Sequence, residues 1–258
     1  MAGVLVLDIA DDIRLCLGEP TVTALTRRFG PEGRCLSCGG RFGVLPLSVR
    51  AYRDHVGIIT LVAYHAGCAA SALVDVGPAV LPRQQTWAAA VTGISLPVAS
   101  RRRFRGRGAP GTRDQVMPVL FAHPSLEMTR TRPASWGEAV NADMEGYSQL
   151  GFAEPSARAR TGPLRPVGQA WMQPSRGAVQ LHVKVADRTW FAPITRRAAM
   201  LAVARGGILV GITCDRDPAR LAAEARYLED AFASGDVLLG WAPLLSGQDK
   251  RRKPGLSC

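Results

Sequence analysis

Lysine is scarce in this chain of 258 residues, where only Lys184, Lys250 and Lys253 carry an ammonium group. Almost all the positive charge is therefore arginine, a bias that coding by a GC-rich bacterial genome produces without any functional cause. That bias does not explain the formal net charge of +11. Such an excess of bases over acids favours an anionic partner, with nucleic acid first and a membrane surface second.

Long apolar runs are missing as well. None reaches the ~18 residues that a transmembrane helix needs, and the nearest, around residues 200–212, is interrupted by Arg205 and by two glycines. The first eight residues lack a basic segment and already include Asp8, so a signal peptide is not expected. We expect a cytoplasmic protein with no transmembrane segment.

Sequence motifs of common enzymes are absent too. The chain has no nucleophile elbow, no P-loop and no glycine-rich dinucleotide fingerprint after a strand. Cys214, which lies between a predicted strand and a predicted helix, is the best candidate for a nucleophile, but the sequence places no histidine base beside it. His123, alone at the end of a predicted strand, is typical of a structural histidine. We therefore predict no catalytic residue.

Cysteine is present in a pattern that indicates metal binding. Three of the six cysteines join one histidine in two close pairs, each pair with two residues between its members: Cys35, Cys38, His65 and Cys68. Paired ligands of this kind bind tetrahedral zinc, and the few scattered cysteines that remain do not form a disulfide framework. Four protein ligands fill the tetrahedron, so the predicted cofactor is a structural zinc with no open position for a catalytic water.

Two other interpretations of these residues stay open. The cysteines can be buried structural residues beside an unrelated pair, or the first pair can be a redox C-x-x-C motif. The redox motif requires a helix that starts at the pair, and Gly39 and Gly40 make a poor helix start.

The residues between the two pairs predict a hairpin, with strands over residues 42–50 and 55–64. Such a hairpin returns the chain to Cys35 and Cys38, and the Ala-rich residues 66–72 can then form a short helix. A knuckle, a hairpin and two ligands at a helix start resemble the treble-clef class of zinc finger; without the helix, the same residues resemble a zinc ribbon. The resemblance covers residues 35–68 and implies a fold and a metal, but no activity.

Positive charge is concentrated in two segments. Residues 100–113 hold six arginines among glycines and one proline, a composition that cannot bury itself and predicts a loop or linker. The second segment is a C-terminal tail predicted to be disordered. We predict that both bind nucleic acid, with one aromatic side chain available for stacking, through Arg101, Arg102, Arg103, Phe104, Arg105, Arg107, Arg113, Lys250, Arg251, Arg252 and Lys253. The alternative is that the loop is merely solvated.

The fold is predicted to be α+β. We expect a β-rich part over residues 1–99 with the finger at 35–72, the basic loop at 100–113, an α+β part over 114–244 and the tail at 245–258. Ala178–Val185 alternates strictly, which predicts an antiparallel strand with one solvated face. The second part is predicted as β-β-α-β-α-β, with helices on one face of the sheet.

Two further local predictions concern the N-terminal residues and the middle of the chain. Residues 4–7 and 13–16 are predicted to be strands, with Cys16 in the core. Ser135 and Glu138 form a capping box, which predicts a helix from residue 135 that Gly151 ends.

From these features we expect a zinc-stabilised basic protein that binds nucleic acid in a regulatory, replication or DNA-transfer accessory role. Two other classes stay open. One is an enzyme, either a nuclease or a thiol-dependent one, with zinc as scaffold; the other is an adaptor that uses the finger to bind another protein.

Overall fold

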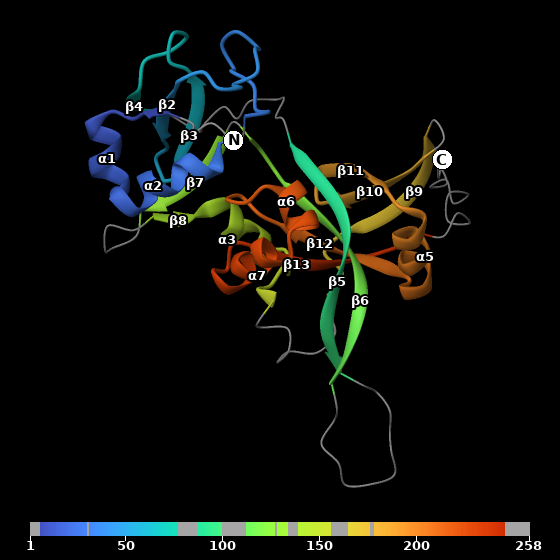
Figure 1. Ribbon diagram of the computed structural model, residues 1–258. Coiled ribbons are helices and arrows are strands. Elements are labelled where there is room, and N and C mark those ends of the chain that lie inside the picture. Colours follow the sequence, from blue (N-terminus) through green and yellow to red (C-terminus); the bar gives the residue numbers. More distant parts are fainter. Residues whose placement is uncertain are drawn as a thin grey trace, which may run out of the picture.

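The chain folds into three β-sheets with short helices packed against them, which confirms the α+β class (Figure 1). The computed structural model describes residues 6–29, 31–76, 87–99, 112–126, 128–133, 139–155, 165–175 and 178–245. All statements about structure below concern these residues.

The first sheet has the order β1-β2-β3-β7-β8, and β4 also pairs with β2. Its strands are β1 (Leu7–Asp8), β2 (Leu47–Arg53), β3 (Ile59–His65), β4 (Ala72–Asp75), β7 (Met128–Pro133) and β8 (Ala139–Asn141). Helices α1 (Asp11–Leu17) and α2 (Glu19–Arg28) pack beside it. Ile13, Leu17 and Leu25 from these helices share one buried cluster with Val49 and Leu61 of β2 and β3. Cys35 and Phe42 belong to the same cluster, so it is the core against which the predicted metal-binding segment packs.

The second sheet has the order β13-β12-β6-β5, and the third is the antiparallel meander β11-β10-β9. Their strands are β5 (Ala88–Ala99), β6 (Thr112–His123), β9 (Gln169–Ser175), β10 (Ala178–Val185), β11 (Arg188–Ile194), β12 (Gly207–Ile212) and β13 (Leu238–Pro243). The helices that accompany them are α3 (Ala142–Gln149), α5 (Arg196–Arg205), α6 (Pro218–Ala223) and α7 (Ala225–Ala233). A buried cluster that includes Leu181, Trp190 and Val210 joins the two sheets.

From Ala178 onward the predicted order is confirmed, as β10, β11, α5, β12, α6 with α7, and β13, whereas strand β9 before it was not predicted. The alternation in β10 gives the predicted strand with one solvated face, because Leu181 and Val183 are buried whereas Lys184 is exposed. The first two of these strands belong to one sheet and the last two to another. The predicted helix after Asp217 is interrupted at Glu224, where the backbone is extended.

The chain crosses between the sheets on both sides of the basic loop. β5 pairs with β6 over its whole length, from Ala88 opposite His123 to Ala99 opposite Thr112. After β6 the chain returns to the first sheet through β7, which pairs with β3. The first sheet therefore contains strands from both sides of residues 100–113, and the domain limits taken from the sequence stay a prediction.

Two local predictions are wrong in the described residues. Residues 13–16 lie in helix α1 rather than a strand, because Ile13 and Leu17, four residues apart, both face the core, and acidic residues occupy the first helical turn. The described helix in the middle of the chain begins at Ala142, since the Asn141 side chain accepts hydrogen bonds from the amides of Asp143 and Met144. Ser135 lies outside the described residues.

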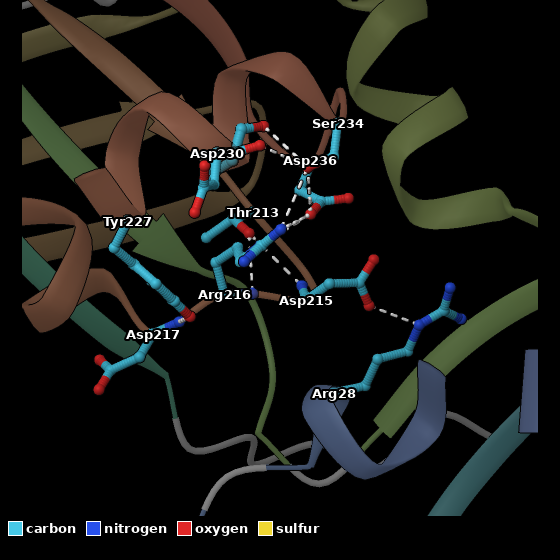
Figure 2. A network of polar contacts seen from close by, with 10 residues as sticks. Arg28, Thr213, Asp215, Arg216, Asp217, Tyr227, Asp230, Ser234 and Asp236 are labelled. Carbon is cyan, nitrogen blue, oxygen red and sulfur yellow. Dashed lines mark hydrogen bonds and ion pairs between the residues drawn. The ribbon is translucent and has the colours of Figure 1, made fainter. Parts of the chain in front are cut away.

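A buried ion pair connects helix α2 with the end of β12. The Nε atom of Arg28 donates to Oδ1 of Asp215 at 2.5 Å, and the Arg28 side chain is only 7% exposed. Figure 2 shows this pair beside a second one, in which Arg216 contacts Asp236 at 2.6 Å and Ser234 donates to the same carboxylate. The hydroxyl oxygen of Thr213 accepts hydrogen bonds from the amides of Asp215 and Arg216, which fixes the loop after β12.

Substituting Arg28 by alanine should destabilise the fold by about 3–5 kcal/mol near neutral pH, because the charge of Asp215 would lose its partner while remaining largely buried. Burial already raises the pKa of Asp215, and Arg28 opposes that rise. A carboxyl whose pKa is raised by folding contributes stability at low pH that is lost as the pH rises through the folded pKa. The deficit of the variant should therefore shrink in acid.

Urea unfolding at roughly pH 5 and pH 8 measures this effect. The double variant Arg28→Ala/Asp215→Asn is the control, since it removes the charge together with its partner and should recover part of the loss at the higher pH. An Arg28→Ala deficit of the same size at both pH values would contradict the account.

Candidate metal centre

The structure brings the four predicted ligands together. One donor atom from each of Cys35, Cys38, His65 and Cys68 lies within 4.8 Å of the other three. Sγ of Cys38 and Nδ1 of His65 are 3.3 Å apart. Cys35 is buried, whereas Cys38 and Cys68 are exposed, so the cluster lies at the surface with one ligand anchored in the core.

Backbone hydrogen bonds shape the first pair into a knuckle. The amide of Gly39 donates to the carbonyl of Cys35 at 2.8 Å, and the amide of Cys35 donates to the carbonyl of Gly40 at 2.9 Å. Gly39 has φ +71°, a left-handed conformation that glycine adopts without a steric penalty. Gly39 therefore allows the chain to turn directly after Cys38.

The second pair comes from the end of strand β3. His65 is its last residue, opposite Leu47 of β2, and the amide of Cys68 donates to the His65 carbonyl at 2.8 Å, which closes a short turn. The hairpin β2–β3 therefore returns the chain to the knuckle, as the spacing predicted. In Figure 1 the loops that carry the two pairs lie together at the top of the view, beyond β2 and β3.

The ring of His65 is held in one orientation. Its Nε2 atom lies 3.0 Å from the carbonyl oxygen of Arg41, and a carbonyl can only accept, so Nε2 carries the proton. Nδ1 is then the unprotonated nitrogen and faces Cys38. Phe42, which is fully buried, meets the ring edge-on with centroids 5.9 Å apart. A carbonyl behind a ligating histidine is a common way to fix its tautomer at a metal.

The thiols of the cluster differ in acidity. Burial opposes ionisation of Cys35, but hydrogen bonds from the backbone of Cys38, His65 and Ser37 outweigh it and lower the pKa of Cys35 to about 7. At Cys68, the hydrogen bond with Cys38 and burial raise the pKa to about 11. Three thiols this close cannot all ionise without a countercharge, which is what a bound cation supplies.

The donor set fits zinc. Zinc–sulfur bonds of about 2.3 Å place the sulfurs of a tetrahedron about 3.8 Å apart, within the spread of the four donor atoms. Three thiol sulfurs and one imidazole nitrogen are soft and borderline ligands, which exclude calcium and magnesium as preferred ions. The geometry therefore shows a cluster that can hold a metal ion, with all four ligands supplied by the protein.

No helix follows the second pair in this fully described segment. Residues 66–68 form a turn, and β4 begins at Ala72, where it pairs with β2 in parallel. The short helix expected over residues 66–72 is therefore absent, because Ala72 and Leu73 join the sheet.

Three further side chains that catalysis could use, those of Asp54, His123 and Cys214, occupy structural positions. Asp54 accepts hydrogen bonds from the amides of Val56 and Ile58, which shape the turn between β2 and β3. His123 is buried and lies beside Cys214, with its Nε2 atom 2.9 Å from the Cys214 carbonyl oxygen. Burial lowers the pKa of His123 to about 4 and raises the pKa of the Cys214 thiol well above its ordinary value. A neutral, buried thiol is a poor nucleophile.

We expect Cys214 to react slowly with a thiol reagent in the native protein, because its side chain is only 3% exposed. The half-buried Cys16 is the internal comparison and should react before Cys214. Cys214→Ser should leave any activity of the protein nearly unchanged. Rapid labelling of Cys214, mapped by mass spectrometry on native protein, would contradict this and restore the thiol-dependent enzyme as a candidate.

The predicted nucleic-acid-binding residues are not brought together by the described structure. Residues 101–107 and 250–253 lie outside it, and Arg113 lies in β6, opposite Val98 of β5. The sequence did not identify the backbone carbonyl of Arg41 that contacts the His65 ring. No sequence pattern can indicate such a contact, because every amino acid has a backbone carbonyl.

The chain matches no family model, no curated protein and no solved structure in the comparisons made with each. The described helices are each too short or too polar to cross a membrane.

Proposed function

We propose that this protein is a zinc-stabilised, basic nucleic-acid-binding protein. The zinc is bound by Cys35, Cys38, His65 and Cys68 in the manner of a zinc ribbon, since a strand rather than a helix follows the second pair. The metal ties the knuckle to the hairpin β2–β3 and has a structural role. In this proposal the anionic partner binds elsewhere on the molecule.

The observation that carries the proposal is that the basic segment of the sequence connects the two strands of a long hairpin. β5 and β6 pair along twelve residues each, so residues 100–111 join the two strands at the end of a long hairpin. Figure 1 shows one end of this hairpin extending away from the other elements. Five arginines of the sequence lie between the two strands, at positions 101, 102, 103, 105 and 107. Guanidinium groups bind phosphate oxygens in pairs of hydrogen bonds, so a cluster of arginines suits a polyanion.

Filter binding of the zinc-loaded full chain to duplex and single-stranded oligonucleotides at low salt tests the proposal. We expect binding to both, without preference for sequence, and no cleavage when magnesium or manganese is added. Failure to retain either oligonucleotide at low salt would remove the proposed function. Metal-dependent cleavage would instead favour the nuclease.

A further inference from the structure

Helix α5 has apolar side chains on two faces, of which only one packs into a core. Ala198 and Ala202 are buried in the cluster that joins the second and third sheets. On the other face, Met200 is 64% exposed and Val203 is 63% exposed. Residues 198–204 include no polar side chain, and a helix that is apolar all round is normally buried on all sides. The described part of the chain therefore leaves the outer face of α5 without a cover.

The outer face of α5 lines an open apolar groove. The rest of the lining comes from the start of β10 and the end of β11, where Val179 and Ile194 are opposite one another. The groove has a volume of about 830 Å³. Figure 1 shows α5 at the periphery of the molecule, beside this sheet. We refer to the groove as the α5 groove and to its main lining as Val179, Ile194, Arg196, Ala199, Met200 and Val203.

The lining residues of α5 have the spacing of one helix face. Arg196 is followed by Ala199, Met200 and Val203, at positions i+3, i+4 and i+7, so an apolar stripe runs along the groove from an arginine at its start. A groove with apolar contacts at this spacing is how many proteins bind an amphipathic helix. The ten residues of α5 extend over about 15 Å, so about three turns of a second helix match its length.

Positive charge lies at both ends of the α5 groove. Arg196 and Arg197 begin the helix and Arg205 ends it, and all three side chains are exposed. The ion pairs among the described residues use other arginines, and the sequence of α5 contains no acidic residue. The groove therefore favours an occupant that brings carboxylates to its two ends.

This chain supplies no such occupant. The segments of the sequence outside the described residues contain only three acidic residues, Glu127, Glu138 and Asp249, and these are far apart in the chain. Two copies packed through α5 would bring the arginines of both chains together, which is unfavourable. Amphipathic helices that lie on a membrane carry Trp, Phe or Leu on the apolar face, whereas the described lining of the α5 groove includes none of these. A helix from another protein is the occupant that remains.

We propose that the α5 groove binds an amphipathic helix of a partner protein, with an apolar stripe that has acidic side chains at both ends. The apolar side chains of the partner contact Val179, Met200 and Val203, and its carboxylates pair with the arginines at the two ends of α5. The apolar contacts in the centre supply most of the affinity, and the ion pairs at the rim supply orientation and fast association. The site uses no residue of the metal cluster or of the basic loop, so this inference does not rest on the proposed function.

A display library of helical peptides tests the proposal. Each peptide has about three turns, with apolar residues at positions i, i+3, i+4 and i+7 and with the residues around this stripe varied freely. Selection on the immobilised, zinc-loaded full chain should enrich peptides that carry Asp or Glu at both ends of the stripe. Enrichment without an acidic bias, or enrichment that is equal on the Val203→Gln protein, would overturn the proposal.

Fluorescence anisotropy of one enriched peptide then measures single variants. Met200→Gln and Val203→Gln should each weaken binding by about 5- to 30-fold, the usual effect of changing a central interface residue. Both side chains are largely exposed, so neither variant should disturb the fold. Leu15→Gln is the matched control, since Leu15 is an apolar residue of α1 that is 87% exposed, and it should bind the peptide as the wild type does. Equal binding by Met200→Gln and Leu15→Gln would contradict the proposal.

Charge reversal separates recognition from damage to the fold. Arg196→Glu should weaken binding of the acidic peptide and strengthen binding of a version in which lysine replaces the acidic residues, a gain that a misfolded protein cannot give. Sedimentation that shows a dimer lost in Val203→Gln would overturn the proposal in favour of a second copy. Binding to phosphatidylglycerol vesicles that the same variant loses would overturn it in favour of a membrane surface. Oligonucleotide binding should be equal in Val203→Gln and in the wild type, so the proposed function is tested separately.

Discussion

Replacing Cys38 by serine should abolish zinc binding and unfold the part of the chain around the first sheet. We expect about one zinc per chain in the wild-type protein and none in the variant. Zinc contributes roughly 10–16 kcal/mol of apparent free energy in small finger peptides, whereas a whole domain is stable by about 5–15 kcal/mol. Removing the metal therefore removes a free energy comparable with the total stability, and most of the variant should be insoluble.

The location of Cys35 explains why loss of the metal should unfold more than the metal-binding loops. Cys35 belongs to the same buried cluster as Phe42, Leu47 and Leu61, so the first ligand is part of the core that α1 and α2 also build. Without a cation, the crowded thiols must stay largely protonated, and the knuckle is held only by its backbone hydrogen bonds. Zinc content by elemental analysis and the soluble fraction after expression measure the two effects.

Matched controls separate ligand loss from the loss of a side chain. Cys16→Ser changes a half-buried thiol that packs against the same core but lies outside the cluster, and it should keep full zinc content. His65→Ala should also lose zinc, and His55→Ala, at an exposed position in the turn between β2 and β3, is its control. Full zinc content in Cys38→Ser would disprove the ligand assignment.

The ligand cluster was predictable from sequence because its geometry is local. The two residues between the ligands of each pair allow both side chains to bind the same ion. One hairpin between the pairs is then enough to bring His65 back to Cys38. Alternation was equally informative in β10, where every second residue from Leu181 to Val185 faces the core. In both cases the pattern and the structure that it produces lie within a short stretch of chain.

Pairing between strands that are distant in the chain leaves no such local pattern in the sequence. The parallel contact of β12 with β6 places Leu209 opposite Val119, ninety residues earlier in the chain, and both strands are uniformly apolar in this region. The contacts of His182 with Trp171 and Phe191 depend on the register of three strands, so the sequence alone could not bring these side chains together. The sequence did not predict helix α1 because the apolar residues within 13–16 also fit a short strand, and the second core contact of the helix, Leu17, lies one residue beyond that segment.

Replacing the five loop arginines Arg101, Arg102, Arg103, Arg105 and Arg107 by alanine should flatten the salt dependence of duplex binding. Each neutralised phosphate releases counterions, so about five contacts give a slope of log affinity against log salt near −4 to −5. The variant should lose most of this slope and weaken all sequences alike, since a glycine-rich loop that contacts only phosphates reads no bases. Filter binding at three salt concentrations measures the slope.

The matched control replaces the same five arginines by lysine. Lysine keeps the charge and the counterion release but loses the paired hydrogen bonds of guanidinium, so the slope should persist while affinity falls moderately. Phe104→Ala should weaken single strands by roughly 1–3 kcal/mol and duplex less, if its ring stacks on a base. The competing account is that the arginines only keep the loop at the end of β5 and β6 solvated. In that case the alanine variant has the wild-type slope, and this result would remove the loop from the proposed binding surface.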